Sequence, residues 1–344
     1  MAEEKIDWSK FDTKGPHDYK PGEMNPAPDL EMQPKWKIPD KVCIQATISG
    51  GGAGFTKKHN PNHPINLDEI RDSAEECIKA GASVVHFDNQ PAGGEGGQTE
   101  QFCLTKDGKE VALGSDSYMY VVKPLLEKYG RERLCPHINC LRGTYQQAME
   151  VVTNGVTEIS YINPSNSPTW MVTTAKLFKE YNIKAELVIH SSAKIDLAER
   201  NLIRTGVMPN PNLWIILPGL LIQWPRRLHD YLPNERAMCQ DLLFLVERIR
   251  EIDPNPFIVV CCVGRATRYL TTLGLLLGLH IRVGMEDTAW KYPHKDEKIK
   301  SNAEEVREAI QIARLLGREV MTPNEYREAV GLKPRFDFLP EGMK

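Results

Sequence analysis

The chain has 344 residues, of which 41% are hydrophobic, and a formal net charge of −3. This length and apolar content allow a large core, and parallel α/β barrels reach this size as one domain. The small charge, without a basic face of Lys and Arg, argues against nucleic acid or a membrane surface as a partner. The most apolar stretch, residues 273–279, is too short to span a bilayer, and the first residues lack the apolar core of a signal peptide.

The eight cysteines are scattered along the chain, and no Cys-x-x-Cys motif occurs. Several of them lie in apolar runs of the kind that form buried strands. This pattern is typical of free, mostly buried thiols in a reducing compartment and not of a disulfide framework. We therefore expect a cytoplasmic protein.

The two ends of the chain differ from its middle. Residues 1–40 hold six prolines, many charges and little apolar periodicity, which predicts an extended arm. Trp8, Phe11 and Trp36 predict that this arm docks on a surface, and we expect that surface to be another subunit of a homo-oligomer. Residues 334–344 form a tail of similar character. The predicted catalytic domain is residues 41–333.

Between these ends, apolar strand segments alternate with helical segments eight times. The predicted strands are residues 42–48, 83–88, 134–139, 157–161, 185–190, 213–217, 257–261 and 280–284. The predicted helices are residues 67–80, 118–129, 145–153, 169–181, 193–205, 235–252, 265–277 and 302–316. Asn66 and Ser301 stand where helix N-caps are expected, and Gly81 and Gly206 where helices end.

Eight strand–helix units predict a (β/α)8 barrel, a TIM barrel. The alternative is a doubly wound open sheet. That alternative is weaker because no Gly-x-Gly-x-x-Gly turn follows the first strand in a nucleotide-binding context.

Two of the predicted strands end in groups that bind metals or move protons. The second strand ends in His86 and Asp88, and the eighth carries Arg282 before the adjacent carboxylates Glu286 and Asp287. The carboxyl ends of barrel strands converge on one mouth, so these side chains can share a site. The alternative is that the two carboxylates cap the following helix and His86 is an ordinary packed residue.

The first strand runs into a glycine-rich segment, Ser-Gly-Gly-Gly-Ala-Gly, that begins at Ser49. Backbone N–H groups at Gly50 and Gly51 are in the right place to contact a phosphate or carboxylate of a substrate. The alternative is a tight bend without a ligand.

At three places near its beginning and four near its end, the sequence resembles the β-keto acid cleavage enzymes, which include the 3-keto-5-aminohexanoate cleavage enzyme. The opening matches are Thr-Ile-Ser-Gly from Thr47, residues 63–70 and residues 80–86. The closing matches are Gly264-Arg265, the block His-Ile-Arg-Val-Gly-Met-Glu-Asp from His280, residues 301–303 and residues 313–318. The resemblance extends over residues 41–333.

This resemblance implies a (β/α)8 barrel that forms a homo-oligomer, with a tetramer favoured. It implies a divalent metal, usually zinc, and acetyl-CoA as co-substrate. The implied reaction converts a β-keto acid and acetyl-CoA into acetoacetate and a new acyl-CoA, which makes the protein an acyltransferase.

The resemblance also assigns the metal ligands and the base. The family's two histidines and one glutamate fall on His86, Asp88 and Glu286, so an aspartate replaces the second histidine. One nitrogen and two carboxylates still form a possible metal site, more oxygen-rich than usual, which leaves manganese or iron open besides zinc. The family's arginine–aspartate pair falls on Arg282 and Asp287, with Asp287 as general base.

The substrate-binding positions of the family are more changed. A threonine falls on Ser160, a serine on Asn139 and a glutamate on Val188, which puts an amino-substituted keto acid in doubt as substrate. His190 shares the parity of Val188 and is predicted as a fourth ligand or as a hydrogen-bond partner of a ligand or of the substrate; His137 is the second candidate.

Two other functions stay open at this stage. One is a metal-dependent aldolase or lyase that needs no CoA. The other is a ligand-binding homologue that has lost turnover, because several site positions are altered.

Overall fold

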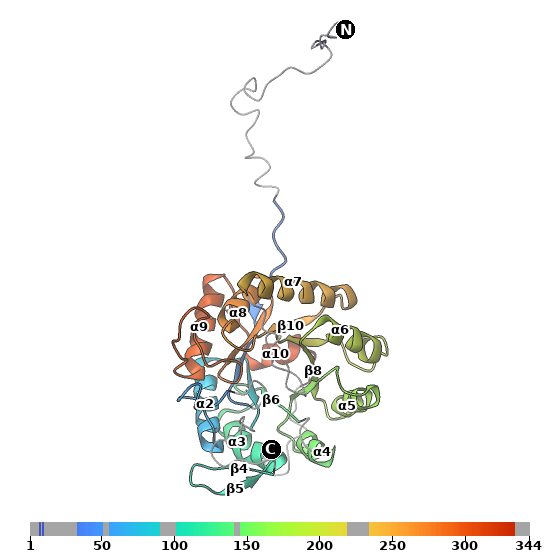
Figure 1. The fold of residues 1–344 in the computed structure, drawn as a ribbon. Coiled ribbons are helices and arrows are strands. Elements are labelled where there is room, and N and C mark those ends of the chain that lie inside the picture. Colours follow the sequence, from blue (N-terminus) through green and yellow to red (C-terminus); the bar gives the residue numbers. More distant parts are fainter. Residues whose placement is uncertain are drawn as a thin grey trace. The chain divides into compact units, whose positions relative to one another are not determined.

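Eight parallel strands close into a barrel in the computed structural model, and Figure 1 shows helices around it. The structure describes residues 7, 9, 33–50, 55–89, 101–140, 145–218 and 234–333. The barrel strands are β2 (Ile44–Thr47), β3 (Val84–Phe87), β6 (Pro136–Ile138), β7 (Ile159–Ile162), β8 (Lys184–Ile189), β9 (Leu213–Ile216), β10 (Phe257–Val260) and β11 (His280–Gly284). They are hydrogen-bonded in this order, and β11 closes on β2 with Gly284 beside Thr47. The predicted (β/α)8 fold is confirmed.

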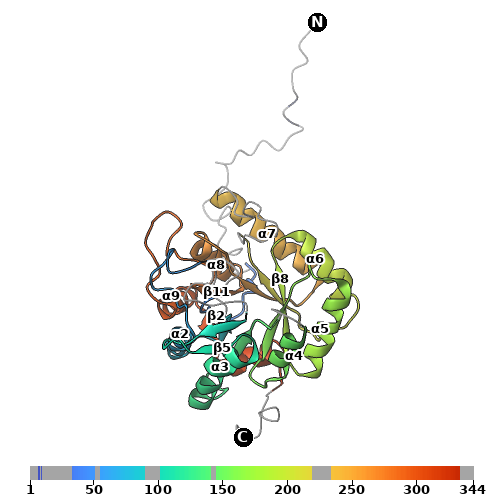
Figure 2. The ribbon, with the colours of Figure 1, turned by 60° about the horizontal axis from the view of Figure 1, so that its bottom comes forward.

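Figure 2 shows the strands enclosed by a ring of helices. The helices of the ring are α2 (Leu67–Ala80), α3 (Ser115–Tyr129), α4 (Tyr145–Thr153), α5 (Pro168–Glu180), α6 (Ser192–Ala198), α7 (Glu235–Ile252), α8 (Thr267–Leu276) and α9 (Asn302–Leu315). The predicted helix 193–205 is divided, because α6 continues as a π-helical segment, η3 (Glu199–Ile203).

The local sequence explains where the helices begin and end. The side chain of Asn66 accepts a hydrogen bond from the Glu69 N–H at 2.9 Å and so satisfies a free donor at the start of α2. Gly81 ends the same helix in the left-handed conformation, at φ 98°, which a side chain would strain. Ser301 caps α9 in the same way as Asn66 caps α2.

Side chains alternate between two apolar layers along each strand. One set, which includes Val84, Ile159 and Leu213, packs together inside the barrel. The other set, which includes Val85 and Leu187, packs between the strands and the helices. The inward set carries the site described below.

Several short elements lie outside the predicted alternation. They are β1 (Lys41–Val42), which pairs with β12 (Glu319–Val320), the hairpin of β4 (Phe102–Leu104) and β5 (Glu110–Ala112), and α10 (Pro323–Ala329). Helix α10 closes the amino-terminal end of the barrel. Its Tyr326 is fully buried against the interior cluster, and its Arg327 is paired with the buried Glu158 at 2.6 Å.

The chain divides into two compact units, residues 1–38 and residues 39–344. Most of the first unit, including Trp8 and Phe11, lies outside the described residues, as does the tail 334–344. Trp36 is described and is 84% exposed. All eight cysteines are free thiols, and seven of them are buried.

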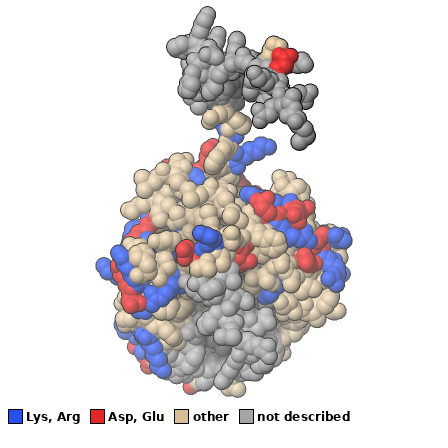
Figure 3. Space-filling view, turned by 45° about the horizontal axis from the view of Figure 1, so that its top comes forward, with Lys and Arg blue, Asp and Glu red and all other residues tan. Residues whose placement is uncertain are grey.

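The described helices include none that is long and apolar enough to cross a membrane. On the face shown in Figure 3, basic and acidic side chains of the described residues are interspersed. This surface is consistent with the small net charge.

Candidate active site

The site begins where β11 leaves the barrel. Gly284 has a φ of 147°, and a Cβ atom there would lie 1.9 Å from the carbonyl oxygen of Thr47. Only glycine permits this close approach of β11 to β2. The turn that follows holds Glu286 and Asp287 against the carboxyl ends of the strands, where both side chains are buried.

Glu286 is held by groups from two neighbouring strands. The Thr47 hydroxyl donates a hydrogen bond to its Oε2 atom, and the Nε2 atom of His86 lies 3.1 Å from the same oxygen. Burial alone would raise the pKa of Glu286, but His86 and Arg282 together hold it below its ordinary value, at about 2. Glu286 is therefore an anion beside an imidazole.

Gly50 brings Asp88 next to this pair. A Cβ atom at Gly50 would lie 2.8 Å from Cδ of Glu286 and 3.0 Å from Cβ of Asp88. The backbone at Gly50 thus passes close to the Glu286 carboxylate and to the Cβ atom of Asp88. Asn139 donates a long hydrogen bond of 3.4 Å to Oδ2 of Asp88. Gly51, predicted with Gly50 to contact substrate, lies outside the described residues.

Arg282 and Asp287 form a buried, two-point ion pair. The guanidinium Nε atom donates to Oδ2 of Asp287 at 3.0 Å, and Nη2 donates to Oδ1. The remaining Nη1 atom donates to the hydroxyl oxygen of Tyr161. Burial raises the pKa of Asp287 to about 6 against the opposing pull of Arg282. A carboxylate with a pKa near 6 is well suited to take a proton close to neutral pH.

Two of the predicted metal ligands, His86 and Glu286, lie side by side. Both ring nitrogens of His86 are buried and have no hydrogen-bond partner among the described residues, although Glu286 is adjacent. Buried polar atoms are rarely left unpaired unless something else binds them. In the described ranges, no group of three or more His, Cys, Asp and Glu side chains stands ready for a metal ion. The candidate site thus consists of the pair His86 and Glu286, and Asp88 lies near Glu286 across Gly50.

His190, predicted as a fourth ligand, is placed at the end of β8. Its Nδ1 atom lies 3.3 Å from the carbonyl oxygen of Leu217. Burial, with Lys194 nearby, lowers the pKa of His190 to about 3, so the ring is neutral. Within the described ranges, no hydrogen bond or ion pair joins it to His86 or Glu286. Val188, on the same face of the strand, belongs to the interior cluster.

Ser160, predicted to bind substrate, does not face the barrel interior. Its hydroxyl oxygen accepts a hydrogen bond from the Cys140 N–H at 3.2 Å, and the Cys140 sulfur lies 2.6 Å away. The next residue, Tyr161, points inward instead and contacts Arg282 and the ring of His86. The inward position on β7 is therefore aromatic.

The sequence named His137 only as a second candidate ligand, and its buried partners Glu186 and Gln45 were not predicted. The ring of His137 packs against His86 with 4.5 Å between the ring centroids, and its Nε2 atom lies 3.6 Å from Glu186. Gln45 donates to the other oxygen of Glu186 at 3.0 Å. These residues could have been noticed in the sequence, because they are polar residues at inward positions of otherwise apolar strands.

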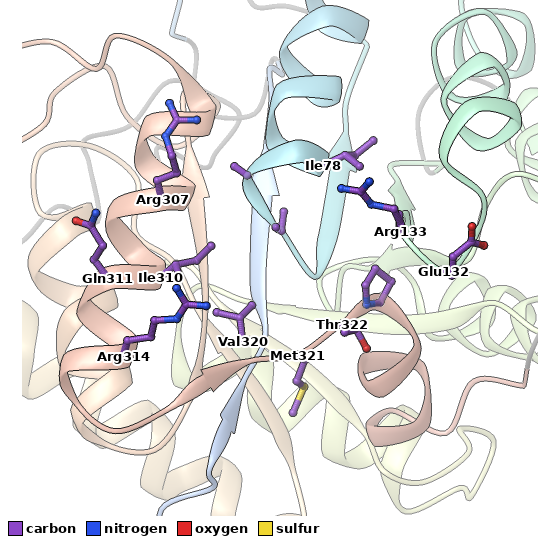
Figure 4. A pocket seen from close by; sticks show the side chains of 14 residues that line it. Ile78, Glu132, Arg133, Arg307, Ile310, Gln311, Arg314, Val320, Met321 and Thr322 are labelled. Carbon is purple, nitrogen blue, oxygen red and sulfur yellow. The ribbon is translucent and has the colours of Figure 1, made fainter.

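Two cavities of the described chain lie at the other end of the barrel. One of about 470 Å³ is formed where α2 runs into β3, with Gly81 and Ala82 in its wall. Figure 4 shows Arg307 and Arg314 of α9 and Arg133 around it. This position is opposite to the strand ends that carry His86 and Glu286, so the cavity is not part of the candidate site.

The chain matches the family model described as beta-keto acid cleavage enzyme over residues 41–108 and 118–332. It is 29% identical to a 3-keto-5-aminohexanoate cleavage enzyme of Fusobacterium nucleatum over 301 residues, covering 86% of this chain and 99% of that one. It is 25% identical to a 3-oxoadipate:acetyl-CoA acetyltransferase of Cupriavidus necator over 304 residues, covering 84% and 95%.

Among solved structures, the chain is similar to ObcA in its binary complex with oxaloacetate. The TM-score is 0.60 at 18% sequence identity, and the match covers 80% of this chain and 68% of that one. This likeness supports the barrel fold. The family model matches well over half of the sequence and includes the strands that carry His86, Arg282 and Glu286. The chain therefore belongs to the β-keto acid cleavage enzyme family.

Proposed function

We propose that this protein transfers an acetyl group from acetyl-CoA to the carboxymethyl part of a β-keto acid. The products are acetoacetate and the acyl-CoA of the remaining acyl group. The observation that supports this proposal is the meeting of His86, Glu286 and the Arg282–Asp287 pair at the carboxyl ends of β3 and β11. The family and the names of the relatives support the same reaction.

His86, Glu286 and Asp88 would hold a divalent cation, with zinc favoured and manganese or iron as alternatives. When bound, this cation supplies a Lewis acid for the keto oxygen of the substrate. Thr47 fixes the orientation of Glu286 through its hydroxyl group. In this arrangement, His86 would offer one ring nitrogen to the cation at the mouth of the barrel.

Asp287 takes the proton from the carbon between the keto and carboxylate groups. Arg282 holds the base in one orientation through both carboxylate oxygens, and Tyr161 fixes the far side of the guanidinium. The resulting carbanion forms a carbon–carbon bond to the acetyl carbonyl and expels the CoA thiolate. That thiolate then attacks the original keto carbon, the older carbon–carbon bond breaks, and Asp287 returns its proton to the departing carbanion.

A panel of β-keto acids tests this proposal. Each is incubated with acetyl-CoA and the metal-loaded protein, and both acetoacetate and the new acyl-CoA are measured. At least one substrate is expected to give the two products in equal amounts. Turnover without CoA would indicate a metal-dependent aldolase or lyase instead. Substrate binding without any turnover would indicate a non-catalytic homologue.

We also propose where the protein is located and how it assembles. We expect a cytoplasmic homo-oligomer, with a tetramer favoured, that acts on small molecules. Nucleic acid and membranes are not expected partners, because the net charge is −3 and basic and acidic side chains are interspersed on the face in Figure 3.

A further inference from the structure

A cationic and aromatic cluster lies at the rim of the barrel, directly after the catalytic carboxylates. Residues 288–300, here called the strap, follow Asp287 and lead to α9. The strap is folded back on itself, because Trp290 pairs with Lys298 in an antiparallel bridge. Thr288 and Ala289 are buried, so they tie the start of the strap to the site.

Two cations lie over the single indole ring of this strap. The guanidinium carbon of Arg265 is 4.4 Å from the centre of the Trp290 ring, and Nζ of Lys298 is 4.2 Å from it. Arg265 belongs to the Gly264-Arg265 pair that the sequence shares with the family. The proposed reaction gives that pair no role. Gly264 itself donates to the carbonyl oxygen of Asp287 at 2.8 Å, so the cluster is fastened to the catalytic turn.

The cluster carries two cations and is partly exposed. Asp296 pairs with Arg265 at 2.5 Å, but the Asp296 side chain is 89% exposed. Lys298 has no carboxylate within ion-pair distance in the described part of the chain. Its pKa is lowered by partial burial and then by repulsion from Arg265. An anion bound here would relieve the repulsion between the two cations.

Phe55, from the segment that follows β2, meets the edge of Trp290 at 5.7 Å between the ring centroids. Phe55 is buried in the interior cluster of the barrel. The cluster of Arg265, Trp290 and Lys298 is therefore a fixed part of the mouth. It stands beside the ends of β10, β11 and β2, on the same side as His86 and Glu286.

We propose that Arg265 and Lys298, held on Trp290, bind the phosphate groups of CoA. This inference rests on the proposed function, in which acetyl-CoA delivers its thioester to the Asp287 site. A long pantetheine arm separates the thioester from the phosphates, so the phosphates stay at the rim while the thioester enters the mouth. Guanidinium and ammonium groups are the side chains that bind phosphate most strongly.

The kinetic test compares two acetyl donors in Arg265→Gln and Lys298→Gln. Acetyl-CoA carries the phosphates, whereas S-acetylpantetheine has the same thioester without them. Each variant is expected to raise KM for acetyl-CoA about tenfold, the loss of one charge-assisted contact. kcat, KM for the β-keto acid and kcat/KM for S-acetylpantetheine are expected to stay at wild-type values.

Lys176→Gln, at an exposed position on α5, is the matched control. Its kinetic constants with either acetyl donor should equal those of wild type. A purely structural role of the cluster would lower the melting temperature or impair both donors equally, and that result would overturn the inference. So would a wild-type KM for acetyl-CoA in both variants.

Calorimetric titration with CoA separates this inference from the proposed function. If wild type binds CoA about tenfold more tightly than the variants yet turns over no β-keto acid, the subsite stands and the proposed reaction fails. If the reaction proceeds but variants and wild type bind CoA equally, the reaction stands and the subsite fails. A wild-type protein that does not bind CoA contradicts both.

Discussion

Glu286 and Asp287 are neighbours in the chain, yet their surroundings give them opposite properties. Glu286 lies beside His86 and Thr47, and its pKa is held at about 2. Asp287 lies deeper beside Arg282, and burial raises its pKa to about 6. Two acidic groups whose environments separate their pKa values are typical of sites that divide ligand and proton-transfer roles. This difference supports Glu286 as ligand and Asp287 as base.

Asp287→Asn is expected to remove the base and keep the metal. Turnover should fall by at least about a hundredfold, which is the usual contribution of a positioned acid or base. Metal content should stay at the wild-type level, because Glu286 and His86 are unchanged. Steady-state kinetics and metal analysis check both parts. Asp72→Asn, an exposed position on α2, is the control. Wild-type turnover in Asp287→Asn would remove Asp287 from the mechanism.

His86→Ala is expected to weaken binding of the divalent cation by at least about a hundredfold, since even outer contacts to a metal ligand cost ten- to a hundredfold. Competition with a chromogenic chelator measures this affinity. Asp88→Ala should weaken it as well if Asp88 is a ligand. His294→Ala, at an exposed position, should bind metal like wild type. Equal affinity in His86→Ala and wild type would show that the metal is held elsewhere.

At the scale of the elements, the barrel interior is unusual because it contains a polar column among apolar strands. Gln45 of β2, Glu186 of β8 and His137 of β6 are all fully buried, and His137 lies level with His86 on the neighbouring strand. Burial raises the pKa of Glu186 to about 7, with Gln45 and Arg282 opposing that rise. The column thus holds a carboxyl group that retains its proton through much of the acidic range.

This raised pKa predicts how stability depends on pH. The unfolded chain releases the Glu186 proton near the ordinary value of 4.5, whereas the folded protein releases it near 7. The stability from this group is therefore full below pH 4.5 and is lost as pH rises through about 7. The difference corresponds to on the order of 3 kcal/mol in the free energy of unfolding.

Glu186→Gln should remove this part of the pH dependence, because glutamine has no proton to release. Denaturant unfolding between pH 4.5 and 8 measures the effect. Relative to the variant, wild type is expected to lose stability as the pH rises. Glu180→Gln, at an exposed position of α5, should follow the wild-type profile. Parallel profiles of Glu186→Gln and wild type would show that Glu186 does not titrate in this range.

The sequence predicted the elements well where apolar periodicity and caps agree. Helices α2, α4 and α7 and strand β11 have the predicted bounds. The hairpin of β4 and β5 and helix α10 were not predicted, because such short elements lack a complete apolar period. In α10, tertiary contacts such as the ion pair of Arg327 with Glu158 supply the missing stabilisation.

The sequence predicted which site residues lie at the strand ends, but not which side chains point into the barrel. His86, Glu286, Arg282 and Asp287 follow from the strand ends and the family resemblance. Ser160 was expected to face the substrate, but its hydroxyl group is hydrogen-bonded to Cys140, and the neighbouring Tyr161 is the residue that points into the barrel. A parallel strand is buried on both faces and reads as one apolar run, so the sequence does not fix which parity points inward. An error of one residue therefore exchanges the inner and outer faces.

At the scale of the whole molecule, the candidate site and the cavity beside Gly81 and Arg314 occupy opposite ends of the barrel. The carboxyl ends of the strands carry His86 and Glu286, whereas α10 closes the other end with the buried Tyr326. This division is the general one for (β/α)8 enzymes, in which one face is catalytic and the other gives stability. Substitutions at the α10 end are therefore expected to affect stability more than turnover.

The arm, residues 1–40, is expected to pack on another subunit of a homo-oligomer. Its described Trp36 is 84% exposed in the single chain, and burial of this indole against another subunit would remove apolar surface from water. A chain that begins at Pro39 keeps the hydrogen bond from Arg318 to the Pro39 carbonyl and that from the Glu319 N–H to the Asp40 carbonyl. Its barrel should therefore fold normally, while the oligomer becomes smaller and the melting temperature falls.

Light scattering and thermal unfolding measure the two effects, and Trp36→Ala in the full chain tests the tryptophan alone. If the shortened chain keeps the full-length oligomeric state and the same melting temperature, the arm makes no structural contact between subunits.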